Sequence, residues 1–334
     1  MTLEPTLLAE WIPLRVHARE DRFIVEWCHL GGERFTEPFF DDTIQRRLRY
    51  PFNWLFRHQT SLDELAELEA KSPGLAPTGL IFHMSRCGST LLAQTLAALP
   101  RNVMLSEPAP VDTVLRARWG EATPTEEQRI AWLRAMVGVL GQKRHAPERH
   151  LFIKFDAWAL LQWPLIERAF PGVPWLFLYR DPVEVMASHL RHSGAHMVPG
   201  VLEPALLGWS PEQLPGMPRE EYGARVLASL CEAALGAWES RRGPARLVEY
   251  RELPAGIPSL YSELFGLELS GEELAVMREA MGRDAKNPVV PFEDDSAMKQ
   301  RALTGPAREA VERWVRPLYA RLEAARRETP GFGL

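Results

Sequence analysis

Five short apolar runs, each separated from the next by helix-forming residues, constrain this chain more than any other feature. Strands that alternate with helices are typical of βαβ units, whose strands lie parallel in one sheet with helices on both faces. The pattern therefore predicts an α/β fold with a mostly parallel sheet. The expected strands are 79–84, 102–105, 150–155, 173–179 and 245–250, and the expected helices are 88–99, 125–142, 156–169, 182–192 and 219–241.

The first 75 residues follow a different pattern. Two β-rich runs occupy 13–20 and 22–30, and Ser61 with Glu64 three residues later is typical of a capping box at a helix start. We expect residues 1–75 to form a small α+β region and residues 76–334 to form the main domain.

The C-terminal part contains one further periodic segment and two irregular ones. Apolar residues at helical spacing from 311 to 322 predict a helix that Pro317 kinks. The segments 193–218 and 282–304 lack periodicity, which is typical of lids and binding loops.

Composition excludes several classes of protein. A net charge of -5 argues against a large nucleic-acid interface, and no window reaches the roughly 18 apolar residues of a membrane span. Three cysteines without metal-site spacing fit a reducing compartment, and acidic residues near the start do not resemble a secretory signal. We therefore expect a cytoplasmic protein.

A candidate phosphate-binding loop follows the first apolar run, in the sequence HMSRCGSTLLAQTL that begins at His83. Backbone N–H groups at a helix N-terminus bind anions, and nucleotide hydrolases add a lysine directly after the glycine of G-K-[ST]. Here Gly88 is followed by Ser89 and Thr90, and the nearest basic residue is Arg86. The loop therefore predicts binding of a 5'-phosphate-type group without triphosphate cleavage.

A second candidate anion site follows the fourth apolar run. Arg180 comes at its carboxyl end, Asp181-Pro182 begins a helix, and Ser188 lies eight residues after the arginine. Ligands of open α/β sheets bind at the carboxyl ends of the strands. Arg180 and Ser188 are thus expected to face the same crevice as the first loop and to bind a second phosphate.

Together these motifs resemble the sulfotransferase family, whose donor is 3'-phosphoadenosine-5'-phosphosulfate (PAPS). The family's 5'-phosphosulfate loop has a basic residue, a small residue, glycine and two hydroxyl residues, as at 86–90, and its 3'-phosphate motif matches 180–182 with Ser188. A third segment, 246–253, is similar to the strand and turn ending in YEDL in many members, with Arg251 in place of the acidic residue. The similarity covers about residues 79–325.

The resemblance implies a P-loop-type fold and transfer of a sulfuryl group, with PAPS as co-substrate and no metal. Sulfuryl transfer moves a group with little charge, which is consistent with the absence of the P-loop lysine. Late in the chain, Lys299 and Arg301 are candidates to close over the donor. The implied donor-binding residues are Ser85, Arg86, Cys87, Gly88, Ser89, Thr90, Arg180, Ser188, Tyr250 and Lys299.

A base must accept the proton of the hydroxyl or amine acceptor. Glu107, just past the second strand, is the first choice, since several branches of the family place a catalytic glutamate there, often as Glu-Pro. Lys154 and Asp156 resemble the Lys-Thr-His of cytosolic sulfotransferases, whose lysine assists the leaving phosphate and whose histidine is the base. Aspartate replaces that histidine here, and Asp156 suits the N-cap of the next helix equally well.

Other interpretations remain open at the level of sequence. The chain fits a P-loop phosphotransferase or a non-catalytic adenosine-bisphosphate-binding protein less well than a sulfotransferase. His189, His192 and His196 are a weak metal-site candidate, and Cys87 near a helix start is a weak candidate for a reactive thiol. His83 is expected to be a packing residue. The acceptor and the oligomeric state are not specified.

Overall fold

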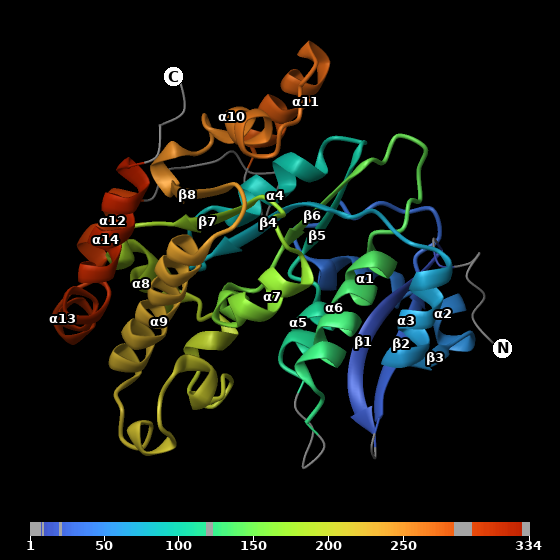
Figure 1. The fold of residues 1–334 in the computed structure, drawn as a ribbon. Coiled ribbons are helices and arrows are strands. Elements are labelled where there is room, and N and C mark those ends of the chain that lie inside the picture. The colour runs from blue at the N-terminus through green and yellow to red at the C-terminus, as the bar shows by residue number, and fades with distance from the viewer. Residues whose placement is uncertain (1–7, 9, 20–21, 118–122, 284–295, 329–334) are drawn as a thin grey trace.

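The computed structural model describes residues 8, 10–19, 22–117, 123–283 and 296–328. Its centre is a five-stranded parallel sheet with the strand order β5-β6-β4-β7-β8 (Figure 1). Every predicted strand is present, and each boundary lies within two residues of the expected position. The strands are β4 (Pro77–His83), β5 (Asn102–Ser106), β6 (His150–Lys154), β7 (Trp175–Tyr179) and β8 (Ala245–Glu249).

The strand order creates a switch point at the centre of the sheet. β4 comes first of the five in the chain, yet β5 lies two positions away, and β6 and β7 flank β4 on its two sides. Ligands of open α/β sheets bind at the carboxyl edge near such a point. The segments that follow β4, β6 and β7 meet at this edge.

Helices cover both faces of the sheet (Figure 1). On one face Gly79 lies against Phe265, and on the other Phe82 contacts Phe155, Trp163 and Trp175. Strands buried on both faces are apolar throughout, which explains the continuous runs in the sequence. The predicted α/β fold class is confirmed. The connecting helices are α4 (Ser89–Ala97), α5 (Ala109–Leu115), α6 (Glu126–Leu140), the 3-10 helix η2 (Ala157–Gln162), α7 (Trp163–Ala169), α8 (Pro182–Arg191) and α9 (Arg219–Ser240).

The predicted kink near Pro317 is present as a break between two helices. α13 ends at Trp314 and α14 begins at Arg316, with Pro317 in its first turn. Proline lacks the N–H that continues a helix but fits its first turn. The elements that follow β8 are η6 (Tyr250–Glu252), α10 (Ile257–Ser259), the π-helical turn η7 (Leu260–Leu264), α11 (Gly271–Met281), α12 (Ser296–Ala302), α13 (Gly305–Trp314) and α14 (Arg316–Arg327).

The two segments without periodicity contain short helices. The region 193–218 carries three 3-10 turns, η3 (Ala195–Met197), η4 (Pro204–Leu207) and η5 (Pro211–Gln213). In the segment 282–304, residues 284–295 lie outside the described part of the chain, and α12 was not expected. None of the described helices combines the length and apolar character that a membrane crossing requires.

The N-terminal region forms a three-stranded antiparallel sheet with three helices. The hairpin and the capping box at Ser61 are present as predicted, whereas β3, α1 and α2 were not expected. This region packs beside α5 and α6 (Figure 1), where Trp132 donates a hydrogen bond to Asp63 (2.7 Å), and its apolar residues join the main core. Its elements are β1 (Trp11–Arg19), β2 (Arg22–His29), α1 (Phe40–Arg47), α2 (Phe52–Leu55), β3 (His58–Ser61) and α3 (Leu62–Lys71). The division at residues 75 and 76 stays a prediction.

Candidate active site

The loop between β4 and α4 has an unusual backbone. Ser85, Arg86 and Gly88 all have positive φ, at 70°, 52° and 86°. A non-glycine residue in this region is strained by roughly 1–2 kcal/mol, and such strain concentrates at functional sites. Among the described residues, the only other non-glycine residue with positive φ is Glu107, at 53°. Backbone strain thus marks the predicted phosphate-binding loop after β4 and the segment after β5 that carries the base candidate Glu107.

The loop leads directly into the first turn of α4. Gly88 is the N-cap of this helix, and the hydroxyl residues Ser89 and Thr90 follow it, both buried. A helix N-terminus preceded by left-handed residues presents backbone N–H groups to an anion, and the helix dipole adds attraction. The geometry of the loop therefore fits a phosphate or sulfate group.

Cys87 is a packing residue of this loop. Its side chain is fully buried, and the thiol donates a hydrogen bond to the carbonyl of Leu178 (3.1 Å). Burial raises the pKa of the thiol to about 12. Burial therefore disfavours the thiolate that a reactive cysteine requires.

Glu107 and Lys154 form a buried ion pair at the carboxyl edge of the sheet. The ammonium of Lys154 is fully buried and lies 2.6 Å from Oε1 of Glu107. It also donates a hydrogen bond to Oγ of Ser106 (3.0 Å), and the backbone N–H of Glu107 donates to the carbonyl of Lys154 (2.7 Å). Neighbouring strands β5 and β6 therefore hold both charged groups in one position.

His83 joins this pair from the end of β4. Its Nδ1 accepts a hydrogen bond from the backbone N–H of Ser85 (3.0 Å), so the ring proton must be on Nε2. From Nε2 the ring reaches the carbonyl of Phe155 (3.0 Å) and Oε1 of Glu107 (3.3 Å). Burial lowers the pKa of His83 despite its carboxylate neighbour, so the ring is neutral. His83 thus links the loop after β4 to Glu107. The sequence predicted only a packing role for this residue.

The two candidate base carboxyls have opposite electrostatic environments. Burial would raise the pKa of Glu107, but Lys154 and then His83 outweigh burial, and the pKa lies below its ordinary value. For Asp156, burial and then the carboxylates of Asp112 and Glu107 raise the pKa well above its ordinary value. Groups whose surroundings separate their pKa values in this way commonly take different roles in proton transfer.

Asp156 stands at the N-cap position of η2, but its side chain forms no capping hydrogen bond. The capping interpretation therefore leaves the carboxyl unexplained. The neighbouring Asp112 is held by Arg116 (2.6 Å) and by the indole N–H of Trp158 (2.6 Å). These two partners fix the carboxyl of Asp112. Asp156 is half-buried beside it.

Arg180 lies beside the phosphate loop. Its guanidinium carbon is 3.9 Å from the centre of the Tyr250 ring, and a Cβ built on Gly88 would lie 2.9 Å from Cδ2 of the same ring. Tyr250 therefore joins the two predicted anion sites into one region, and only glycine fits at position 88. Within the protein, Arg180 contacts Glu184 (2.5 Å) and donates to Oγ of Ser296 (3.0 Å), and it is buried.

The remaining predicted donor-binding residues lie on elements around Arg180. Ser188 is half-buried on α8, about one helical turn beyond Glu184. Lys299 is buried on α12, the helix whose first residue contacts Arg180 and whose Gln300 donates to Glu184 (3.1 Å). Arg86 extends from the loop to the backbone carbonyl of His192 (2.6 Å). The structure thus brings Lys299 to the same side of the site as Arg180.

The histidine cluster contains one close pair. The rings of His189 and His196 lie 5.2 Å apart, edge to face, and burial lowers the pKa of His196 to about 4. Across the described ranges, no three histidine, cysteine or acidic side chains converge on a point that would hold a metal ion. The rings therefore pack against each other rather than around a common centre.

The N-terminal region contributes to the site, which the sequence did not indicate. The ring of Phe39 lies over Lys154, with its centre 4.7 Å from Nζ, and the carbonyl of Pro38 accepts a hydrogen bond from Ser106 (2.8 Å). Nearby, partial burial and then the carboxylates of Asp42 and Glu107 raise the pKa of Asp41. The segment that precedes α1 therefore forms one wall around the Glu107–Lys154 pair.

Solved structures with similar folds include several sulfotransferases. The sulfotransferase domain from the curacin biosynthetic pathway is 16% identical, with 74% of this chain and 98% of that chain covered and a TM-score of 0.45. Sulfotransferase STF9 from Mycobacterium avium is 17% identical, with 84% of this chain and 82% of that chain covered and a TM-score of 0.46. The sulfotransferase from Alicyclobacillus acidocaldarius is 15% identical, with 75% of this chain and 96% of that chain covered and a TM-score of 0.41.

No protein-family model matches this chain, and no curated protein matches it with significance. The solved structures named above all belong to the family that the motifs at 86–90 and 180–188 resemble. Their TM-scores are below 0.5 and their identities are low, so similarity of this degree does not decide a function. The function proposed below depends on the geometry of the site.

Proposed function

We propose that this protein is a sulfotransferase that moves a sulfuryl group from PAPS to a hydroxyl or amine acceptor. One observation carries the proposal. The strained loop at Gly88 and the buried guanidinium of Arg180 both lie against the ring of Tyr250, which supports a pair of anion sites on either side of one aromatic side chain. This arrangement suits a nucleotide with phosphate groups at both its 3' and 5' positions.

In this proposal each end of the donor has its own set of residues. The N–H groups of the loop at 85–90 and the start of α4 would bind the 5'-phosphosulfate. Arg180 and Ser188 would bind the 3'-phosphate, with Lys299 on the neighbouring α12. Glycine is required at position 88 because a Cβ there would collide with Tyr250.

Lys154 would supply the cation that the loop lacks. Its ammonium lies at the carboxyl end of β6, in a buried position where a charge acts more strongly than in water. There it would stabilise the negative charge that develops on the 5'-phosphate as the bond between sulfur and the bridging oxygen breaks. The sulfuryl group would form its new bond to the acceptor oxygen or nitrogen, with adenosine 3',5'-bisphosphate as the other product.

The electrostatics favour Asp156 over Glu107 as the group that takes the acceptor proton. A carboxyl with a raised pKa is the stronger base once ionised, and Asp156 has that environment, while Glu107 is stabilised as an anion by Lys154. Glu107 would then hold Lys154 in place beside the loop. This division assigns proton transfer to Asp156 and positioning to Glu107.

Donor binding is tested by calorimetry with adenosine 3',5'-bisphosphate in the absence of magnesium. We expect binding by the wild type and a loss of about 1.5–3 kcal/mol in Arg180→Ala, the contribution of a charge-assisted hydrogen bond. Arg251→Ala is the matched control, because Arg251 is exposed beside Tyr250 and pairs with Glu249. Because Arg180→Ala removes the cation that pairs with Glu184, Ser188→Ala provides a second variant, expected to bind several-fold more weakly.

Two results would contradict the donor assignment. Arg180→Ala that binds the bisphosphate as tightly as the wild type would remove the second anion site. Binding of ATP only with magnesium, and no binding of the bisphosphate, would favour the phosphotransferase alternative.

The base assignment is tested by sulfuryl transfer from PAPS to a panel of alcohols and amines. We expect Asp156→Asn to lower kcat by about 10²- to 10⁴-fold and to remove the acidic limb of the pH–rate profile. That limb should lie above the ordinary aspartate pKa, since activity appears as Asp156 loses its proton. Transfer that survives both Asp156→Asn and Glu107→Gln would place the base elsewhere.

A further inference from the structure

An exposed aromatic segment on the N-terminal region is not explained by the proposed function. Residues 46–57 read RRLRYPFNWLFR and include the short helix α2. Five of the eleven large apolar side chains that are exposed in the described part of the chain lie in this segment, and the other six all come after residue 189. The five are Tyr50 (47%), Phe52 (44%), Trp54 (65%), Leu55 (76%) and Phe56 (48%).

The segment is held firmly in this outward orientation by its polar residue. Asn53 is buried, accepts a hydrogen bond from the N–H of His29 (2.7 Å), and donates to the carbonyls of His29 and Arg47 (both 3.1 Å). An asparagine inside and tryptophan and leucine outside reverse the usual distribution of side chains. Exposed apolar side chains in a contiguous group indicate a surface that binds something.

The charges around the segment are positive. No acidic residue occurs between positions 43 and 62, although the chain as a whole carries a net charge of -5. Arg46 and Arg47 both pair with Glu33, at 2.5 Å in each case, and Arg46 also pairs with Glu37 (2.7 Å). Arg49 and Arg57, at either end of the aromatic residues, are exposed and form no ion pair with a described acidic residue. The segment therefore presents apolar side chains between two cations.

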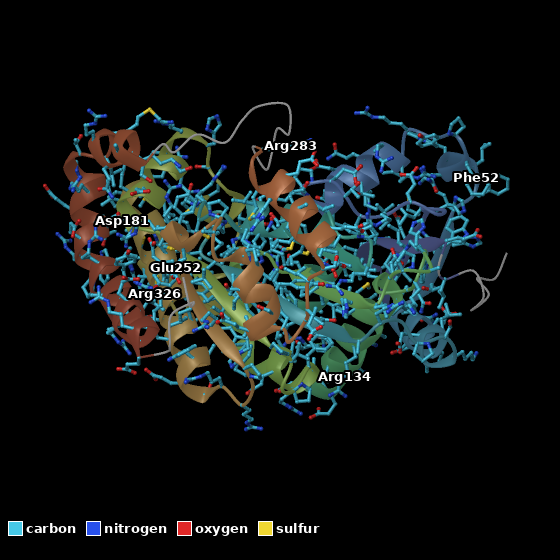
Figure 2. The ribbon with its side chains drawn as sticks, turned by 90° about the horizontal axis from the view of Figure 1, so that it is seen from above. Phe52, Arg134, Asp181, Glu252, Arg283 and Arg326 are labelled. Carbon is cyan, nitrogen blue, oxygen red and sulfur yellow. The ribbon has the colours of Figure 1, made fainter. Side chains whose placement is uncertain are left out.

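The size and position of the segment favour a lipid surface over a protein partner. A specific protein interface buries about 800 Å² on each side and uses about 20–30 residues, whereas the exposed apolar residues here come from seven consecutive positions. Tryptophan, tyrosine and arginine are the residues that anchor proteins at the boundary between lipid headgroups and acyl chains. Figure 2 shows Phe52 at one end of the molecule, far from Asp181 on α8, so a planar surface is able to approach it.

We propose that residues 49–57 dock this protein on an anionic lipid bilayer, with Trp54 and Leu55 inserted at the headgroup boundary and Arg49 and Arg57 beside lipid phosphates. The segment is connected to the active site by α1, which begins after Phe39 and ends at Arg47. A helix of eight residues is about 12 Å long. Docking would therefore bring the membrane surface close to the wall that Phe39 forms.

The test is co-sedimentation of the full-length protein with vesicles of phosphatidylcholine that contain phosphatidylglycerol, compared with vesicles of phosphatidylcholine alone. We expect binding to the anionic vesicles that weakens as salt is raised. The double variant Trp54→Ser, Leu55→Ser should bind at least about ten-fold more weakly. Arg49→Glu with Arg57→Glu should lose about five-fold or more for each arginine.

The control removes exposed apolar side chains elsewhere. Val201→Ser with Val276→Ser alters two exposed apolar side chains (42% and 40%) outside the segment and should bind vesicles as the wild type does. Arg49 and Arg57 are exposed, so their substitution is not expected to unfold the protein. The Arg49→Glu, Arg57→Glu variant therefore keeps the test decisive if the Trp54 and Leu55 variant unfolds.

Three results would overturn the proposal. The first is no binding to anionic vesicles even at low salt, and the second is equal binding by the wild type and both segment variants. The third is self-association of the wild type without lipid, detected by sedimentation velocity and abolished in the Trp54 and Leu55 variant. That result would make the occupant a second copy of the chain.

Discussion

Replacing Lys154 by methionine is expected to destabilise the protein in a way that depends on pH. The substitution keeps the length of the side chain but removes the ammonium that lies 2.6 Å from Glu107. Removing one partner of a buried ion pair costs about 3–5 kcal/mol, and we expect the lower end because Glu107 retains 24% exposure of its side chain. An unfolding entropy of about 0.7 kcal/mol/K for a chain of this length then gives a decrease in Tm of about 4 °C at neutral pH.

The direction of the pH dependence follows from the pKa of Glu107. In the wild type this pKa is lowered, so the stabilisation is present above the ordinary glutamate pKa of about 4.3 and is lost as pH falls below it. In Lys154→Met, burial becomes the main influence and raises the pKa of Glu107. The folded variant then holds its proton more tightly than the unfolded chain, so its stability should fall as pH rises above the ordinary glutamate pKa.

The assay is thermal and urea unfolding, followed by circular dichroism, of the wild type, Lys154→Met, Glu107→Gln and the double variant. The double variant should recover at least half of the lost stability, because no unpaired charge remains buried. The explanation fails if the double variant is no more stable than Lys154→Met. It also fails if Lys154→Met shows the same pH dependence as the wild type.

Three further predictions concern the loop and its surroundings. Gly88→Ala should lower stability by at least about 1 kcal/mol and abolish bisphosphate binding in calorimetry, because a Cβ meets Tyr250 and the φ of 86° is left-handed; normal binding would show that the loop tolerates a side chain. Cys87 should resist iodoacetamide in the native protein at pH 8 and react after unfolding in urea, as mass spectrometry of its peptide will show, since its pKa is about 12; rapid native labelling would refute its burial. Arg316→Ala should cost less than about 1 kcal/mol, because its 2.8 Å contact with Asp181 is partly exposed. The pKa of Asp181 is lowered, so this deficit should be present above the ordinary aspartate pKa and be lost in urea unfolding as pH falls through the lowered pKa; a deficit that persists once folded Asp181 is protonated would contradict an ionic origin.

The sequence predicted those parts of the fold that local patterns encode. Each strand of the parallel sheet is a run that is buried on both faces, and the capping box at Ser61 marks the start of α3 correctly. The short helices α1 and α2 were missed, because four to eight residues carry too little periodicity. The helix at 311–322 was predicted as one kinked element, but the missing N–H of Pro317 divides it.

The site was predictable only where motif residues follow strands. The loop at 85–90, Lys154 and Arg180 come directly after or at the ends of strands, so their positions follow from the parallel sheet. The contributions of His83 and Phe39 depend on tertiary contacts. The position of His83 at a strand end could have indicated its place in the site, since its ring reaches the residue that follows the neighbouring strand β6. Nothing in the sequence around Phe39 indicates that its ring lies over Lys154.

The contact between Phe39 and Lys154 has a consequence for protein engineering. A shortened gene that starts at residue 76 would encode every sulfotransferase-like motif, yet its product would leave the lysine ammonium hydrated and Ser106 without its carbonyl acceptor at Pro38. Water at that position would weaken the attraction between Lys154 and Glu107, since Coulomb energies fall as the local dielectric rises. Residues 38 and 39 therefore belong to the surroundings of Lys154, and a chain that starts at residue 76 lacks them.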